Sequence, residues 1–342
     1  MTIRYPDPLA PGDRIGVTAP SSGVAPPLRE RLEVSVRALR DQGFDVVVGA
    51  CMDGLGHVSA PARERAAELT AMLVDPTIRA VVPPWGGETA IDLLDLLDWD
   101  AIARARPTWM VGFSDISTLI TPLTLRTGVA TVHGQNLMDT PYTVPPPLVS
   151  WLDVVQAPSG SSIDQGPAPA YRAEGFDDYA THPTVDTFTL DTPGTWTRFD
   201  GEDEVTVSGR LVGGCIETLS NLVGTPFGDV PAFARDHAPE GLVVYLEAAE
   251  APSFDIARRL HGMRLAGWFD QAHGVLVART RAPGAPSLSQ REAVMDALGG
   301  LGLPIVGDVE CGHVPPHLAL VNGALATVSW SIDGGAVRQT LA

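Results

Sequence analysis

Ser114, in the segment Gly112-Phe113-Ser114-Asp115, is the residue whose position best suits nucleophilic chemistry. A short apolar run ends at Gly112 and helical spacing of apolar residues begins at Ile116, so Ser114 falls on a strand-to-helix turn. A serine on such a turn projects its hydroxyl into a cleft, and the N–H groups that begin the next helix can face a developing oxyanion. An ordinary helix N-cap fits the same position, and the local pattern alone favours the cap.

A second turn, Trp85-Gly86-Gly87-Glu88, follows the preceding β-like run. The carboxyl ends of neighbouring parallel strands meet at one edge of a sheet, so we expect Gly86 and Gly87 to lie beside Ser114. Two glycines permit close backbone approach and can offer an N–H group to the same oxyanion. The alternative is a plain tight turn between a strand and a helix.

The choice of catalytic base is narrowed by an absence in the composition. All 23 basic side chains are arginine, and the sequence contains no lysine. This excludes a P-loop lysine, a pyridoxal-phosphate Schiff base and a Ser–Lys dyad. A serine nucleophile in this chain must therefore use a histidine or a carboxylate as its base.

Several histidines and acids are candidates for that role. His313 lies in a Gly- and Pro-flanked loop after a strand, and His133 is a rival base. The spacing of His313 and His317 also permits metal binding, although no third ligand stands nearby. Glu247 ends an apolar strand, where it either reaches the surface or orients a histidine, and Glu250 suits the second role equally.

The composition limits the classes of partner. The 342 residues predict about two domains. A net charge of −18 argues against a nucleic-acid groove and against an anionic membrane surface. Three scattered cysteines are too few for a disulfide framework, and neither a signal-like N-terminus nor an apolar run of about 18 residues is present. We expect a cytoplasmic protein that needs no metal or cofactor.

The pattern of the first 140 residues is that of an α/β domain. The expected strands are 14–19, 45–48, 79–83 and 109–112, and the expected helices are 28–39, 62–73, 88–97 and 116–125. This alternation predicts a doubly wound parallel sheet of the flavodoxin or Rossmann type in residues 1–140. Residues 141–203, rich in proline and acids, are predicted to connect it to a mixed β-rich, barrel-like domain in residues 204–342.

Taken in order along both domains, these segments resemble the LD-carboxypeptidase family of serine peptidases, which also holds the microcin C self-immunity peptidases. The matching segments are 12–21, 86–87, 112–115, 132–134, 209–214, 224–226, 246–247 and 311–313.

The resemblance implies a Ser-Glu-His triad of Ser114, Glu247 and His313. It also implies an oxyanion hole of backbone N–H groups near Gly87 and Asp115. The nucleophile would come from the first domain and its partners from the second, so the site would lie at their interface. The family further implies a cytoplasmic homodimer.

The substrate implied by the family is a small peptide or a peptidyl nucleotide. The murein branch releases D-alanine from a tetrapeptide by cutting an L,D bond, and this is the activity we favour. The microcin branch cuts an amide between an aspartyl residue and a nucleotide-like group, on whose base an aromatic residue stacks. Phe176 and Trp196 are our stacking candidates, although each could simply anchor the connecting segment. Cys215, at a substrate-binding position, replaces the Asn of many relatives.

Two readings from other classes compete with a serine peptidase. A non-catalytic ligand-binding protein with two α/β-like lobes would not depend on Ser114 for any turnover. A metal hydrolase would lose its activity with a chelator.

Overall fold

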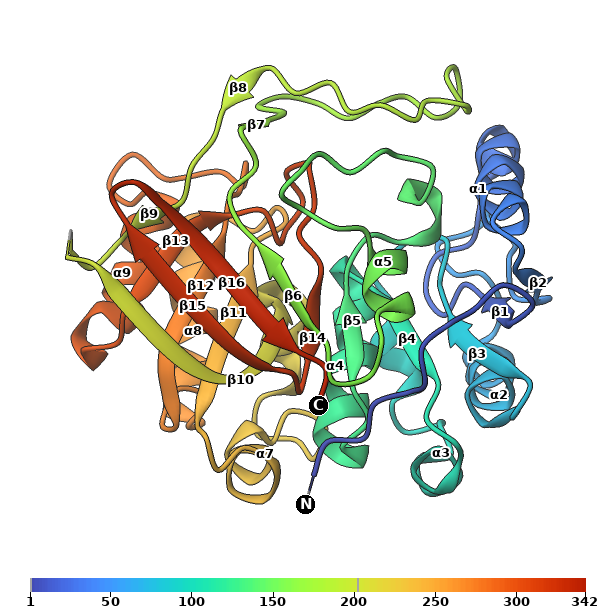
Figure 1. Cartoon of the computed structure of the whole chain (residues 1–342), viewed down its shortest axis with the longest axis horizontal. Helices are drawn as coiled ribbons and strands as arrows, with labels where there is room; N and C mark the ends of the chain where they lie inside the picture. The colour runs from blue at the N-terminus through green and yellow to red at the C-terminus, as the bar shows by residue number, and fades with distance from the viewer. Residues whose placement is uncertain (1, 202) are drawn as a thin grey trace.

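The computed structural model describes residues 2–201 and 203–342. Two large β-sheets lie side by side in it with helices around them, and a small two-stranded sheet stands apart from both (Figure 1). The first sheet has the order β14-β5-β4-β3-β1-β2. Its strands are β1 (Arg14–Val17), β2 (Asp45–Val48), β3 (Ile78–Val81), β4 (Trp109–Gly112), β5 (Thr131–His133) and β14 (Leu320–Asn322). All its pairs are parallel except β14 with β5. The predicted doubly wound parallel sheet is confirmed.

Helices connect these strands and cover the sheet. They are α1 (Arg29–Asp41), α2 (Ala62–Val74), α3 (Trp99–Arg104), α4 (Ser117–Thr127) and, after β5, α5 (Trp151–Gln156). The helix expected over 88–97 is wrong: a 3₁₀ turn at Ala90–Leu93 precedes α3. The Asp98 side chain accepts the N–H of Ala101 and so starts a separate helix.

The second sheet is mixed and has the order β6-β16-β15-β10-β11-β12-β13-β9. Its strands are β6 (Ser162–Gln165), β9 (Thr197–Arg198), β10 (Val205–Cys215), β11 (Leu242–Glu247), β12 (Ala272–Ala278), β13 (Ile305–Val309), β15 (Leu325–Ser331) and β16 (Gly334–Thr340). The pairs from β10 through β13 are parallel. The order ends at β6 and at β9, so this β-rich sheet is open, where the sequence suggested a barrel-like closure.

Four helices accompany the second sheet: α6 (Ile216–Leu219), α7 (Val230–His237), α8 (Ser253–Leu265) and α9 (Gln290–Leu298). Among residues 2–201 and 203–342, no helix combines the length and the hydrophobicity that a bilayer crossing requires.

Each of the two large sheets includes strands from outside its predicted domain. β6 and β9 come from the predicted connecting segment and form the edges of the second sheet, whereas β14 returns from the C-terminal part to pair with β5 of the first. The predicted domain boundaries at 140 and 203 therefore stay predictions.

The connecting segment also carries an arm. β7 (Ala170–Tyr171) pairs with β8 (Thr192–Pro193), and the chain between them, which we call the strap (residues 172–191), extends toward α1 (Figure 1). Arg31 of α1 is fully buried and donates to the carbonyl oxygens of Pro183 and Val185, which fixes the strap against the first sheet's helices.

Helix α4 joins the two halves. Its residues from Ser117 to Leu125 are all buried, as expected of a helix with protein on every side. Thr121 donates to the carbonyl of Gly213 in β10, and the Ser117 hydroxyl accepts the N–H of Cys215 at the end of that strand. The first turn of α4 is thereby held against the carboxyl end of β10.

Candidate active site

Ser114 occupies a strained turn between β4 and α4. Its φ of 62° lies in the left-handed region, which is uncommon and costly for a residue with a side chain. Gly112 before it has a φ of 153°, and a Cβ there would lie 2.7 Å from Ile116, so the turn requires glycine. Ser114 makes no N-cap hydrogen bond, which removes the cap interpretation. Its hydroxyl is instead turned toward His313.

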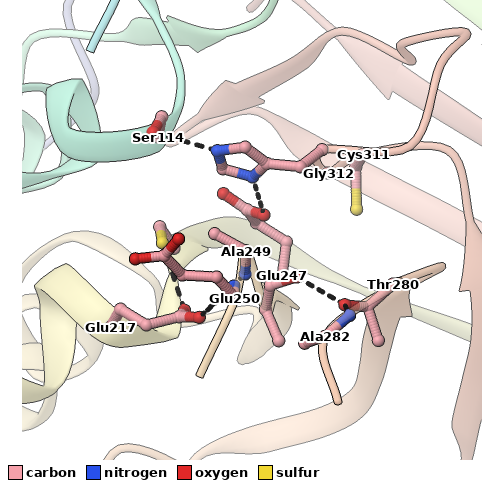
Figure 2. A network of polar contacts seen from close by, with 12 residues as sticks. Ser114, Glu217, Glu247, Ala249, Glu250, Thr280, Ala282, Cys311 and Gly312 are labelled. Atoms are coloured by element: carbon pink, nitrogen blue, oxygen red, sulfur yellow. Dashed lines mark hydrogen bonds and ion pairs between the residues drawn. The ribbon is translucent and has the colours of Figure 1, made fainter. Parts of the chain in front are cut away.

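Two hydrogen bonds connect Ser114, His313 and Glu247. The distance from His313 Nε2 to Ser114 Oγ is 3.0 Å, and that from His313 Nδ1 to Glu247 Oε2 is 2.7 Å. Figure 2 shows the serine and the carboxylate at opposite ends of the imidazole. Glu247 ends β11 and His313 lies in the loop after β13, so residues from both sheets meet at their carboxyl edges.

The electrostatics of the pair suit a histidine base. Burial of Glu247 opposes its charge, but the attraction and hydrogen bond of His313 keep its pKa below the ordinary value. Burial likewise opposes the cation of His313, and the Glu247 carboxylate outweighs it and raises the pKa of that imidazole. Because the carboxylate can only accept, Nδ1 carries the proton and Nε2 is free to take one from Ser114.

The Gly86-Gly87 turn packs directly against the serine. A Cβ at Gly86 would lie 2.9 Å from Ser114 Oγ and 3.0 Å from the backbone N of Asp115. Gly87 has a φ of 141°, and a Cβ there would collide with the Ser21 hydroxyl. The expected proximity of this turn to Ser114 is what the structure shows, because the backbone of Gly86 lies against both the Ser114 hydroxyl and the backbone N of Asp115.

The side chain of Asp115 has a structural contact of its own. It is buried and accepts hydrogen bonds from the Ser21 hydroxyl at 2.6 Å and from the N–H of Ala90 at 2.9 Å. These bonds tie together the loops that follow β1, β3 and β4. Asp115 thus holds together the loops that lie next to Ser114.

The rival candidates lie in other environments. His133 is fully buried, its Nε2 bonds the carbonyl of Cys311, and burial lowers its pKa. Glu250 is exposed. His317 directs Nδ1 to the carbonyl of Gly312. Within the described part of the chain, no group of three or more His, Cys, Asp or Glu is placed to hold a metal.

Cys215 and Glu217 form hydrogen bonds next to the site. Burial raises the pKa of the Cys215 thiol far above its usual value, and that thiol donates to Glu217 Oε2 at 3.3 Å. Glu217 Oε1 accepts the N–H groups of Ala249, Glu250 and Ala251 (Figure 2). Glu217, which our sequence reasoning missed, therefore holds the loop that follows Glu247.

Two cavities meet at His313. One, of about 360 Å³, is lined largely by rings, and we call it the aromatic cavity; its rings include Trp85, Phe113, Tyr142, Phe176, Tyr179 and Phe188. The other, of about 430 Å³, contains Ser114 and several acids, and we call it the acidic cavity. Phe176 and His313 line both.

The two proposed stacking residues have different positions. Phe176 is 63% exposed and lies between the cavities, as a stacking residue would. Trp196 is 2% exposed, packs in the core beneath the second sheet and donates to Glu310. It lines neither cavity, so the expectation for Trp196 is wrong. Tyr179 and Phe188 of the strap, together with Tyr142, supply rings that the sequence did not reveal.

Comparison with known proteins places the chain in a family. Residues 15–134 match the LD-carboxypeptidase N-terminal domain, and residues 208–328 match the LD-carboxypeptidase C-terminal domain. A Streptomyces coelicolor protein classed among the carboxypeptidases is 31% identical over 94% of this chain and 92% of its own length. The chain belongs to the LD-carboxypeptidase family.

Other relatives represent both branches of the LD-carboxypeptidase family. The murein tetrapeptide carboxypeptidase of Pseudomonas aeruginosa is 26% identical over 72% of this chain and 70% of its own. The microcin C7 self-immunity protein MccF of Escherichia coli is 24% identical over 94% and 92%.

Solved structures establish the fold independently. An MccF-like protein from Bacillus anthracis superposes with a TM-score of 0.80 at 20% identity, over 98% of this chain and 99% of its own. MccF in complex with aspartyl sulfamoyl adenosine gives 0.78 at 21% identity, over 98% and 97%. The two-sheet arrangement is therefore that of MccF.

Proposed function

We propose that this LD-carboxypeptidase family member is a serine peptidase in which Ser114 is the nucleophile, His313 the general base and acid, and Glu247 the orienting carboxylate. The observation that carries the proposal is the continuous hydrogen-bonded chain from Glu247 through His313 to Ser114. The strained turn at Ser114 and the burial of Glu247 support it, because both are features of an activated nucleophile.

The proposed reaction has two halves. His313 Nε2 takes the hydroxyl proton as Ser114 Oγ bonds to the scissile carbonyl carbon, whose oxygen becomes an oxyanion facing N–H groups near Gly87 and Asp115. The C–N bond then breaks, and His313 gives the proton to the departing amine. Water, deprotonated by His313, then attacks the acyl-enzyme carbonyl, the ester C–O bond breaks, and His313 returns its proton to Ser114 Oγ as the acid leaves. Glu247 stabilises the imidazolium in both halves.

For the substrate, we propose first the L,D bond at the end of a murein tetrapeptide, with release of D-alanine. The murein tetrapeptide carboxypeptidase among its relatives supports this choice. The acidic cavity, of about 430 Å³, lies within the size range of small-molecule binding sites.

A second substrate class is favoured by the aromatic cavity. Six rings beside His313 can hold a planar group, and Tyr142 and Phe188 already stack at 4.1 Å. An aminoacyl or peptidyl nucleotide amide would place its base there, and MccF, which shares this fold, has been solved in complex with aspartyl sulfamoyl adenosine.

The test compares the two substrates with wild-type protein and Ser114→Ala. D-alanine release from the tetrapeptide supports the murein activity, and cleavage of aspartyl sulfamoyl adenosine supports the second. Ser114→Ala should lose either activity by at least about 10³-fold. Turnover that survives Ser114→Ala would contradict a serine peptidase. If wild type binds both compounds but turns over neither, the result would support the ligand-binding alternative.

We further propose the cytoplasm as the location and a homodimer as the assembly. Light scattering at micromolar concentration should give twice the monomer mass of 36.1 kDa. A monomer mass at that concentration would contradict the dimer.

A further inference from the structure

Arg281, in the loop after β12, is held beside the proposed catalytic histidine. Its Nη2 donates to the backbone carbonyl of His313 at 3.3 Å, and its Nη1 donates to the carbonyl of Gly175 in the strap at 2.7 Å. Its guanidinium lies 4.3 Å from the centre of the Phe176 ring. Three contacts therefore orient this cation at the wall of the acidic cavity that contains Ser114.

The charge of Arg281 is not paired. Within residues 2–201 and 203–342, its side chain donates only to carbonyl oxygens, whereas the neighbouring Arg172 and Arg279 form ion pairs with Asp177 and Glu310. Burial lowers the pKa of Arg281, and the attraction of a nearby acid does not offset this. A half-buried guanidinium with carbonyl partners alone keeps the capacity to bind an anion.

Acidic side chains surround Arg281, so a positive charge at this position matters for the binding of an anionic substrate. The cavity is also lined by Glu88, Asp115, Glu174, Glu217 and Glu250. The carboxylates of Asp115 and Glu217 already accept protein N–H or O–H groups, but their field would still repel an anionic substrate. Apart from His313, Arg281 is the only cationic side chain among the described residues that line this cavity.

A carboxypeptidase must distinguish the end of a chain from its interior, and the distinguishing group is a carboxylate next to the scissile bond. This chain has no lysine, so a permanently charged cationic side chain that binds this group must be an arginine. We propose that Arg281 binds the terminal carboxylate of the substrate's leaving residue. The inference rests on the proposed serine carboxypeptidase function and adds the residue that selects the chain end.

The test uses two substrates that differ only in the terminal group: a murein tetrapeptide ending in D-alanine and the same peptide ending in D-alaninamide. Wild type should prefer the free acid. Arg281→Gln should lower kcat/KM for the acid by about 10- to 100-fold, mainly through KM, and leave that for the amide nearly unchanged. Arg281→Lys should recover part of the preference because it keeps the charge. If Arg281 has only a structural role, Arg281→Gln should lower kcat/KM equally for the acid and for the amide.

The matched control is Arg172→Gln, whose arginine lines the aromatic cavity but is paired with Asp177. It should leave the acid-to-amide ratio unchanged. An unchanged ratio in Arg281→Gln, or a wild type indifferent to the terminal group, overturns the role of Arg281 while Ser114-dependent hydrolysis stands. If wild type cleaves neither peptide and its Ser114 is not labelled by a fluorophosphonate, the proposed function itself is wrong. If wild type cleaves only a nucleotide amide, the proposal that Arg281 binds a terminal carboxylate is wrong.

Discussion

Glu247→Gln removes one charge and little volume, and it tests the electrostatic part of the mechanism. Glu247 is completely buried, and its Oε2 lies 2.7 Å from His313 Nδ1. In the proposed transition state His313 becomes a cation, so the carboxylate stabilises that state more than the neutral imidazole. Glutamine can still accept the Nδ1–H hydrogen bond, but it carries no charge.

The expected magnitude follows from Coulomb's law. Two unit charges about 4 Å apart in a medium of effective dielectric constant near 20 attract by about 4 kcal/mol. At about 1.36 kcal/mol for each tenfold change, kcat should fall by about 10³-fold. The pKa of His313 should also fall, because burial then acts without the opposing carboxylate. A base must be neutral to act, so the acidic limb of the pH–rate profile should move to lower pH.

The assay is the pH dependence of kcat/KM for wild type, Glu247→Gln and the control Glu250→Gln, whose exposed acid lies three residues further on. The control should fall far less than Glu247→Gln, because Glu250 is exposed to solvent, which screens its attraction for His313 across the acidic cavity. A kcat for Glu247→Gln within tenfold of wild type, or an acidic limb that moves to higher pH, would refute the reasoning.

Three further outcomes are expected. Ser114→Gly should be inactive yet about 1 kcal/mol more stable in urea unfolding than Ser114→Ala, because glycine relieves the φ of 62°; equal stability would argue against strain. Gly86→Ala should lower kcat/KM by more than about 10²-fold with an unchanged circular dichroism spectrum, because its methyl group would lie 2.9 Å from Ser114 Oγ; full activity would place the oxyanion elsewhere. Arg31→Leu should speed proteolytic cleavage within the strap, because two carbonyl contacts of 2.6 and 3.0 Å are lost; an unchanged cleavage rate would show that other contacts hold it.

The first sheet and the loops at its edge could be predicted because their signals are local. The apolar runs of β1 and β4, with helical spacing between the strands, predict a parallel sheet. Because the carboxyl ends of neighbouring parallel strands meet at one edge, the sequence also predicts that Gly86 lies beside Ser114. His313 and Glu247 were candidates among equals by pattern. The structure separates them from His133 and Glu250 through contacts that no spacing encodes, and their catalytic roles stay predictions until tested.

The remaining features depend on contacts between distant residues. Arg31 reaches the strap across more than 150 positions, so no periodicity in residues 172–191 reveals that this segment is anchored. Trp196 looked like a free aromatic residue in a loose segment, but β9 pairs with β13 and carries it into the core. Arg281 resembled any other surface arginine, because its hydrogen bonds to two carbonyl oxygens beside the acidic cavity are visible only in three dimensions.

The central claim is that Ser114 is the nucleophile, and covalent labelling tests it most directly. Wild type treated with a fluorophosphonate should gain one adduct, which peptide mass spectrometry should locate on Ser114, and Ser114→Ala should gain none. Wild-type protein that stays unmodified, or an adduct on another residue that persists in Ser114→Ala, would contradict the account.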